Sequence, residues 1–169
     1  MASRLARLLA HRLWDEADAH RALPADALER LRERVARSEA RHTGEIRVCI
    51  EAGLPLGYLW HRATPRERAL ALFGKLRVWD TEHDNGVLIY LLLAERHVEI
   101  VADRALARLV TPAEWQRLAD AMAEAFRTGR FEEGLLEAVA GVDALLFEYF
   151  PRAPGTPRDN ELPDAPLVI

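Results

Sequence analysis

Cysteine is almost absent from this chain, in which Cys49 is the only one among 169 residues. A single cysteine excludes an internal disulfide bond. Cys49 stands inside a strand-like run of apolar residues, and this position favours a buried, inert thiol over a reactive nucleophile.

Long apolar stretches are also missing. The longest, Val87 to Ala94, ends at Glu95 and Arg96 and is far shorter than the roughly 20 residues that a membrane-spanning helix needs. The first ten residues contain arginines and no uninterrupted apolar region, which argues against a secretory signal. We therefore expect a soluble, cytoplasmic protein with no integral membrane segment.

Neither sign of charge dominates the chain. The formal net charge is -4, and acidic and basic residues alternate along the sequence, a pattern typical of solvated helix faces. No basic surface suited to nucleic acid is predicted, so nucleic acid is excluded as a partner. Because half of the residues are hydrophobic, one domain can build a sizeable core.

Signatures of well-defined catalytic chemistry are absent too. The sequence contains no glycine-rich phosphate loop, no Gly-x-Ser-x-Gly elbow, no His-Glu-x-x-His helix and no Cys-x-x-Cys pair. Cys49 lacks the arginine spacing of a phosphate-binding cysteine loop, and no Asp-x-Asp nucleophile motif occurs. The residues alone therefore support none of the known phosphatase mechanisms.

Helices are predicted wherever apolar residues recur at helical spacing next to capping signals. Two of these segments open with a capping box followed by proline, at Thr64 and at Thr111. The helix after Thr64 is expected to bury Leu70, Phe73 and Leu76. The predicted helices span about residues 3–19, 24–42, 65–78, 112–128 and 131–149.

The first of these helices has two interpretations. Its leucines near helical spacing indicate either a helix docked on the domain or one lying on a membrane surface. Acidic residues follow it immediately, at Asp15, Glu16 and Asp18. They favour docking.

Three segments are predicted to form strands. Residues 45–51 alternate strictly between apolar and other residues, as in a half-buried strand, and we expect an outer strand there. Residues 87–93 are continuously apolar, which is typical of a central strand covered on both faces. Residues 98–102 then fold back as its antiparallel partner. Together with the helices, this order predicts an α/β fold, an αβα sandwich in which helices cover both faces of a small mixed sheet.

Three parts of the chain are distinguished by composition. Residues 1–22 form an N-terminal helical extension, and residues 23–150 carry the predicted domain. Residues 151–169 contain five of the nine prolines and end in three apolar residues, so we expect an extended tail that docks on the domain.

An acidic loop precedes the predicted central strand. Residues 80–86 contain three carboxylates, an imidazole and a carboxamide, the oxygen-rich composition that calcium favours. Asp80, Glu82 and Asp84 are its candidate metal ligands. The spacing does not match an EF-hand.

The hairpin predicts a fourth ligand. If Ala94 pairs with His97, Asp103 lies opposite Leu88 and returns close to Asp84. Two neighbouring aspartates repel each other unless a cation or an arginine lies between them, so Asp84 and Asp103 predict a site for Ca²⁺ or another divalent cation. The alternative is that Asp84 belongs to a turn and Asp103 caps the next helix.

Other candidates for function are two histidines and two tryptophans. His83 and His97 are interpreted as a loop residue and a strand-face residue rather than as ligands or catalysts. Trp60 and Trp79 flank the helix after Thr64. They either line a groove or pack in the core or in a partly buried position, and we favour packing.

These motifs resemble the TPM domain, the family of thylakoid lumen proteins, photosystem II repair proteins and many bacterial homologues. The similar stretch runs from about Ala25 to Leu146. It includes His-Thr-Gly at 42–44, Asp-Asn-Gly-Val-Leu at 84–88 and Arg-Phe-Glu-Glu-Gly-Leu at 130–135. Residues 160–166 resemble the ending of short bacterial members that have no signal peptide.

The resemblance implies an αβα sandwich, with divalent metal bound in loops at one end of the sheet in some members and an acid phosphatase activity proposed for a plant member. It also implies a membrane protein of the LemA type as a candidate partner. Two hypotheses result. The first is a non-enzymatic binding or accessory module that acts through a protein partner. The second is a metal-dependent phosphatase in which Arg104 would bind phosphate.

Overall fold

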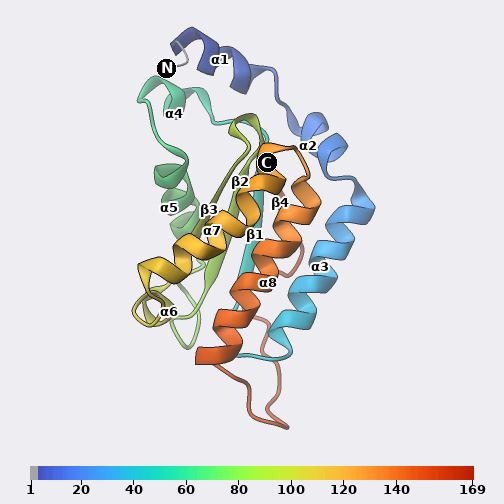
Figure 1. Ribbon diagram of the computed structural model, residues 1–169, viewed down its shortest axis with the longest axis vertical. Coiled ribbons are helices and arrows are strands. Elements are labelled where there is room, and N and C mark those ends of the chain that lie inside the picture. The colour runs from blue at the N-terminus through green and yellow to red at the C-terminus, as the bar shows by residue number, and fades with distance from the viewer. Residues whose placement is uncertain (1–3) are drawn as a thin grey trace.

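A four-stranded mixed sheet forms the centre of the computed structural model, which describes residues 4–169 (Figure 1). The strand order is β3-β2-β1-β4. β1 (Ile46–Glu51) runs parallel to β2 (Val87–Leu92) and to β4 (Leu167–Val168), whereas β3 (His97–Ala102) runs antiparallel to β2. The helices are α1 (Arg4–Arg12), α2 (Glu16–Ala22), α3 (Ala25–Glu39), α4 (Leu56–Trp60), α5 (Pro65–Lys75), α6 (Arg104–Ala107), α7 (Pro112–Arg127) and α8 (Phe131–Tyr149).

Helices cover both faces of this sheet, so the predicted αβα sandwich is confirmed (Figure 1). One face packs against α3, α7 and α8 and forms the larger hydrophobic core. The other face packs against α5, α4 and buried Leu162 from the C-terminal segment. No helix within residues 4–169 has both the length and the apolar character needed to cross a bilayer.

β1 is an inner strand, and the prediction of an outer strand is wrong. The C-terminal residues pair with it, Cys49 opposite Leu167 and Ile50 opposite Val168, so β1 has a neighbour on each side. All six of its residues are buried, the polar ones included. Cys49 has no solvent exposure, and burial raises the pKa of its thiol to about 12, in agreement with an inert thiol.

The β2–β3 hairpin forms as predicted, but its register differs by two residues. Val87 lies opposite Ala102, and the Asp103 amide donates to the Gly86 carbonyl oxygen at 2.8 Å. The loop between the strands is longer than predicted. It contains a 3₁₀ turn at Leu93–Glu95, followed by Arg96 in the left-handed conformation (φ 49°). Because side chains alternate with period two, the shift leaves every residue on its predicted face.

The N-terminal segment contains two helices instead of one. Asp15 caps the start of α2 through a capping box with Asp18, so a new helix begins there after α1 has ended at Arg12. Ser3, the first residue of that prediction, lies outside the described residues. The segment docks on the domain: His11 is buried, its Nδ1 accepts from the Leu54 amide at 3.0 Å, and its Nε2 lies 2.8 Å from Glu95.

Helix α5 buries only part of the face that its apolar spacing predicts: Phe73 and Leu76 are half-buried against the core. Leu70 is exposed, while Ala69 and Leu72 are buried together with Arg68. Arg68 reaches under the helix to the β1 side chain Glu51, with Nη2 2.6 Å from Oε1. The predicted burial of Leu70 is therefore wrong, and the Arg68–Glu51 ion pair lies on the inner side of the helix instead.

Candidate functional site

Two turns meet at the end of the sheet where β1 and β2 begin. Asp84, with φ 50°, adopts the left-handed conformation that Asp tolerates better than most residues. Its carbonyl oxygen accepts a hydrogen bond from the Ala105 amide at 3.0 Å. The Asp103 amide donates to the Gly86 carbonyl oxygen at 2.8 Å. These two backbone bonds bring the turn before β2 and the turn after β3 together, as the hairpin predicted.

Asp103 and Asn85 each hold a buried oxygen without a protein partner. Asp103 caps α6 through Oδ1, which accepts from the Arg104 amide at 2.7 Å, and its Oδ2 has no donor. The Asn85 side chain is fully buried, and its Nδ2 donates to Thr43 Oγ1 at 3.2 Å, while its Oδ1 has no donor. Buried polar atoms normally have a partner, and such oxygens suit a hard cation or an ordered water.

An arginine lies beside both aspartates. The Arg104 Nη2 is 4.0 Å from Asp84 Oδ1, and its Nε is 3.9 Å from Asp103 Oδ1. The Arg104 side chain is largely exposed, so water screens both contacts. The structure therefore contains the alternative features as well: a turn at Asp84, a helix cap at Asp103 and an arginine between them.

The remaining candidate ligands, Asp80 and Glu82, are exposed in the loop before β2. The Asp80 carboxylate pairs with Arg77 at 2.5 Å. The backbone amide of Glu82 donates to the Glu161 side chain at 2.9 Å. No three His, Cys, Asp or Glu side chains within the described part of the chain gather in a way that could hold a metal ion. Asp103 and Asn85 fit an oxygen-coordinated cation better than Asp80 and Glu82 do.

The two histidines lie as interpreted from the sequence. His83 is exposed in the loop, and His97 lies on β3, where its Nε2 is 2.8 Å from Glu99. This carboxylate raises the pKa of His97. Trp60 and Trp79, in contrast, are 75% and 48% exposed, so neither packs into the core, and only Trp79 fits the expected partly buried packing.

Gly86 allows the turn to approach the backbone at Val78 closely. A Cβ atom at this position would overlap the Val78 carbonyl oxygen, a backbone atom that cannot rotate away. We expect Gly86→Ala to lower the free energy of unfolding by about 1–3 kcal/mol, measured by urea denaturation. Gly57→Ala is the control, because a Cβ there meets nothing within 4 Å. Equal stability of the two variants would contradict this account of the turn.

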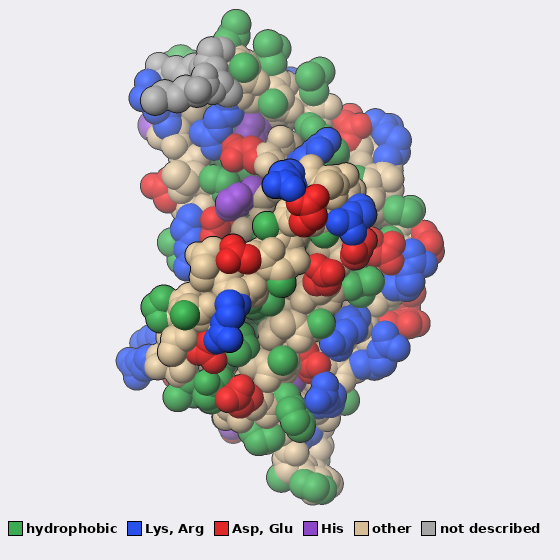
Figure 2. Space-filling model, viewed as in Figure 1, with side chains coloured by type: hydrophobic (Ala, Val, Ile, Leu, Met, Phe, Trp, Pro, Cys, Tyr) green, Lys and Arg blue, Asp and Glu red, His purple; other side chains and the backbone are tan. Residues whose placement is uncertain are grey.

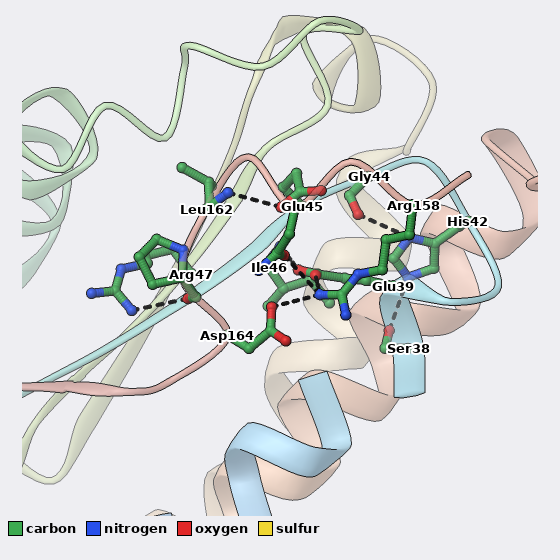
Figure 3. A network of polar contacts seen from close by, with 12 residues as sticks. Ser38, Glu39, His42, Gly44, Glu45, Ile46, Arg47, Arg158, Leu162 and Asp164 are labelled. Carbon is green, nitrogen blue, oxygen red and sulfur yellow. Dashed lines mark hydrogen bonds and ion pairs between the residues drawn. The ribbon is translucent and has the colours of Figure 1, made fainter. Parts of the chain in front are cut away.

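A second polar cluster, missed by the sequence analysis, lies under the C-terminal segment (Figure 3). Glu39 Oε1 accepts from the Ile46 amide at 2.7 Å, and its Oε2 pairs with Arg158 Nη2 at 2.5 Å. Glu45 Oε2 accepts from the Leu162 amide at 3.0 Å, and Asp164 also pairs with Arg158, at 2.6 Å. Burial raises the pKa of Glu39 to about 8 and that of Glu45 to about 7.

Beside this cluster lies a serine, histidine and aspartate set that does not form a catalytic triad. Ser38 Oγ lies 2.8 Å from His42 Nε2 and donates to Asp143 Oδ1 at 2.9 Å. In a catalytic triad the aspartate binds the histidine Nδ1. Here the aspartate accepts from the serine instead, and His42 Nδ1 faces the Gly44 carbonyl oxygen. All three side chains are buried, and burial lowers the pKa of His42 to about 4. Without access for a substrate, the set has a structural role.

No local signal reveals this second cluster. Glu39 ends α3 and Glu45 directly precedes β1, whereas Arg158, Leu162 and Asp164 lie more than a hundred residues later. Only the return of the C-terminal segment along β1 brings them together.

Three comparisons with known proteins place this chain. A family model of the TPM domain matches residues 17–145. A solved structure, the NMR structure of the BA42 protein from the psychrophilic bacterium Bizionia argentinensis, superimposes with a TM-score of 0.75 at 25% sequence identity, covering 86% of this chain and 94% of that one. No curated protein matches. The chain belongs to the TPM domain family.

Proposed function

We propose that this chain is a non-enzymatic binding module that holds a divalent cation, in the first place Ca²⁺, among Asp84, Asn85 and Asp103, and that acts through a protein partner. The observation that carries the cation is the pair of buried oxygens without a donor, Asn85 Oδ1 and Asp103 Oδ2. They lie on two turns that backbone hydrogen bonds hold together. Leaving both oxygens unsatisfied costs stability, and an oxygen-seeking cation would satisfy them.

The charges of the site indicate weak binding. Two carboxylates and one amide are fewer charged ligands than tight calcium sites use, and Arg104 adds a positive charge at about 4 Å from both aspartates. Dissociation constants of about 0.1–1 mM are typical of such calcium sites. Because the Arg104 side chain is exposed and its ion pairs are screened by water, a cation can displace it at little cost.

A calcium titration followed by ¹H–¹⁵N NMR tests the proposal. We expect shifts confined to residues 84–86 and 103–105 in the wild-type protein. Asp103→Asn should weaken binding at least about tenfold, because asparagine still caps α6 but lacks the charge. Arg104→Gln should strengthen binding by about two- to tenfold, since a like charge is removed.

Asp120→Asn is the matched control for this titration. Asp120 is an exposed acid on α7, and its loss changes the net charge of the protein equally. Its affinity for Ca²⁺ should equal that of the wild type. Absent shifts at millimolar Ca²⁺, or an Asp103→Asn variant that binds as tightly as the wild type, would refute the site.

A metal-dependent phosphatase is the second candidate, favoured by one observation. Arg104 presents an exposed guanidinium beside both aspartates, where it could hold a phosphate oxygen. A bound cation would there polarise a phosphoryl oxygen. Turnover of a phosphate ester that requires added Ca²⁺, Mg²⁺ or Mn²⁺ and disappears in Asp84→Asn would establish this function. Equal turnover in Asp84→Asn would identify a contaminant and leave the binding module.

The protein partner and the cytoplasmic location remain predictions. A membrane protein of the LemA type is the candidate partner by family resemblance. Co-purification of such a protein with the tagged full chain, in the presence of Ca²⁺, tests the pairing. Failure to recover it under conditions that saturate the cation site would argue against this partner.

A further inference from the structure

The outer face of α1 exposes a row of leucines. Leu5 and Leu9 on α1 are 68% and 55% exposed, and Leu13, directly after the helix, is 76% exposed. Their spacing of four residues, with the Leu13 amide donating to the Leu9 carbonyl oxygen at 3.0 Å, places them on one stripe. On α4, Leu56 and Trp60 are 58% and 75% exposed. Isolated exposed leucines are common on protein surfaces, but a stripe together with an exposed tryptophan is not.

The stripe points outward because other residues of α1 attach it to the domain. Arg7 Nη2 donates to the Ala63 carbonyl oxygen at 2.8 Å and pairs with Glu95, and His11 binds Leu54. These bonds connect α1 to the residues just before and just after α4. Figure 1 shows α1 and α4 at the same end of the molecule, and Figure 2 shows hydrophobic side chains gathered over α1.

The surface of α1 and α4 is locally basic, although acidic residues border it: Glu95 pairs with Arg7, and three acids follow α1 within residues 15–18. Residues 5–13 and 52–63 contain three arginines, Arg7, Arg12 and Arg62, and no Asp or Glu, although the chain as a whole carries -4. Arg12 and Arg62 are exposed, and neither makes an ion pair within residues 4–169. The end therefore combines apolar side chains with unpaired positive charge.

We propose that this surface, formed by the outer face of α1 together with α4, lies on an anionic lipid bilayer. Leucines that project from an outer helix can enter the boundary between head groups and acyl chains without a complementary groove. Tryptophan prefers the same depth, and arginines attract anionic head groups. The unpaired positive charge in an acidic chain is the reason to choose an anionic bilayer over a protein surface as the occupant.

Co-sedimentation of the full chain with vesicles tests the proposal. We expect binding to vesicles of phosphatidylglycerol and phosphatidylcholine, weakening in high salt, and at least about tenfold weaker binding to phosphatidylcholine alone. Leu9→Gln with Leu13→Gln should reduce binding about tenfold or more, since both side chains are exposed and their loss spares the core. Arg12→Gln and Arg62→Gln should each reduce it about fivefold.

The matched control changes the same residue types elsewhere. Leu109→Gln with Arg108→Gln alters an exposed leucine and an exposed arginine next to α6, far from α1 in Figure 1, and should leave binding unchanged. Asp103→Asn should also leave it unchanged, because vesicle binding does not depend on the cation site.

Tryptophan fluorescence with brominated lipids reports which end inserts. The quenched fraction of the emission should fall in Trp60→Phe, while in Trp79→Phe it should be at least as large as in the wild type. Three outcomes would overturn the proposal: no co-sedimentation with either vesicle, equal binding to neutral and anionic vesicles, or a lipid-free dimer that the leucine variant abolishes.

Discussion

Replacement of Arg68 by methionine should lower the free energy of unfolding by about 3–5 kcal/mol, the cost of leaving a buried charge without its partner. Arg68 holds the buried Glu51 carboxylate with Nη2–Oε1 2.6 Å and Nε–Oε2 3.0 Å. The Tyr90 hydroxyl donates to the same carboxylate at 2.6 Å. Burial and this carboxylate raise the pKa of Tyr90, so the phenol keeps its proton and remains a donor.

Urea denaturation of four proteins separates the lost pair from lost packing. The double variant Glu51→Gln with Arg68→Met removes both charges and should lose much less stability than Arg68→Met alone. Arg32→Met breaks an exposed pair with Glu29 and should cost at most about 1 kcal/mol. An Arg68→Met variant as stable as Arg32→Met would show that the buried pair contributes little.

Raising the pH from about 6 to about 9 should lower the free energy of unfolding by about 2–4 kcal/mol, because Glu39 and Glu45 must lose protons in a buried site. Their ordinary pKa is 4.5, and in the folded protein it is about 8 and about 7. Within that interval the folded state binds more protons than the unfolded state, so stability falls as pH rises. The contribution is complete below pH 4.5 and is lost at the folded pKa values.

Denaturation at several pH values checks this slope. His42 does not contribute to it above about pH 7, because its pKa is lowered and its ring is neutral in both states. Glu39→Gln and Glu45→Gln should each flatten the slope. Glu29→Gln, on the exposed surface of α3, should leave it unchanged. A wild-type stability that stays constant over this range would show that Arg158 keeps Glu39 ionised.

The candidate site was predictable in part. The pairing of β2 with β3 brings Asp84 and Asp103 to one end of the sheet, and two turn residues at the ends of a hairpin suffice to predict that. The two-residue shift in register follows from the turn at Leu93–Glu95, which no periodicity indicates. The burial of Asn85 against Thr43 depends on a chain segment forty residues earlier.

The sequence by itself determined the elements whose signals are local. Capping boxes at Thr64 and Thr111 start α5 and α7 where predicted, and the apolar run at β2 predicts its place inside the sheet. These features depend on residues a few positions apart, since capping and alternation are short-range effects.

Only the tertiary structure decided which residues lie next to β1 and which face α5 buries. β4 comes from the last three residues of the chain, and Arg68 turns inward because Glu51 lies beneath it. A strand edge and a buried charge both need partners, and the partners are chosen by how the whole chain packs. For the same reason, the sequence shows only that the leucines of α1 share a face. The tertiary structure shows that this face points away from the domain.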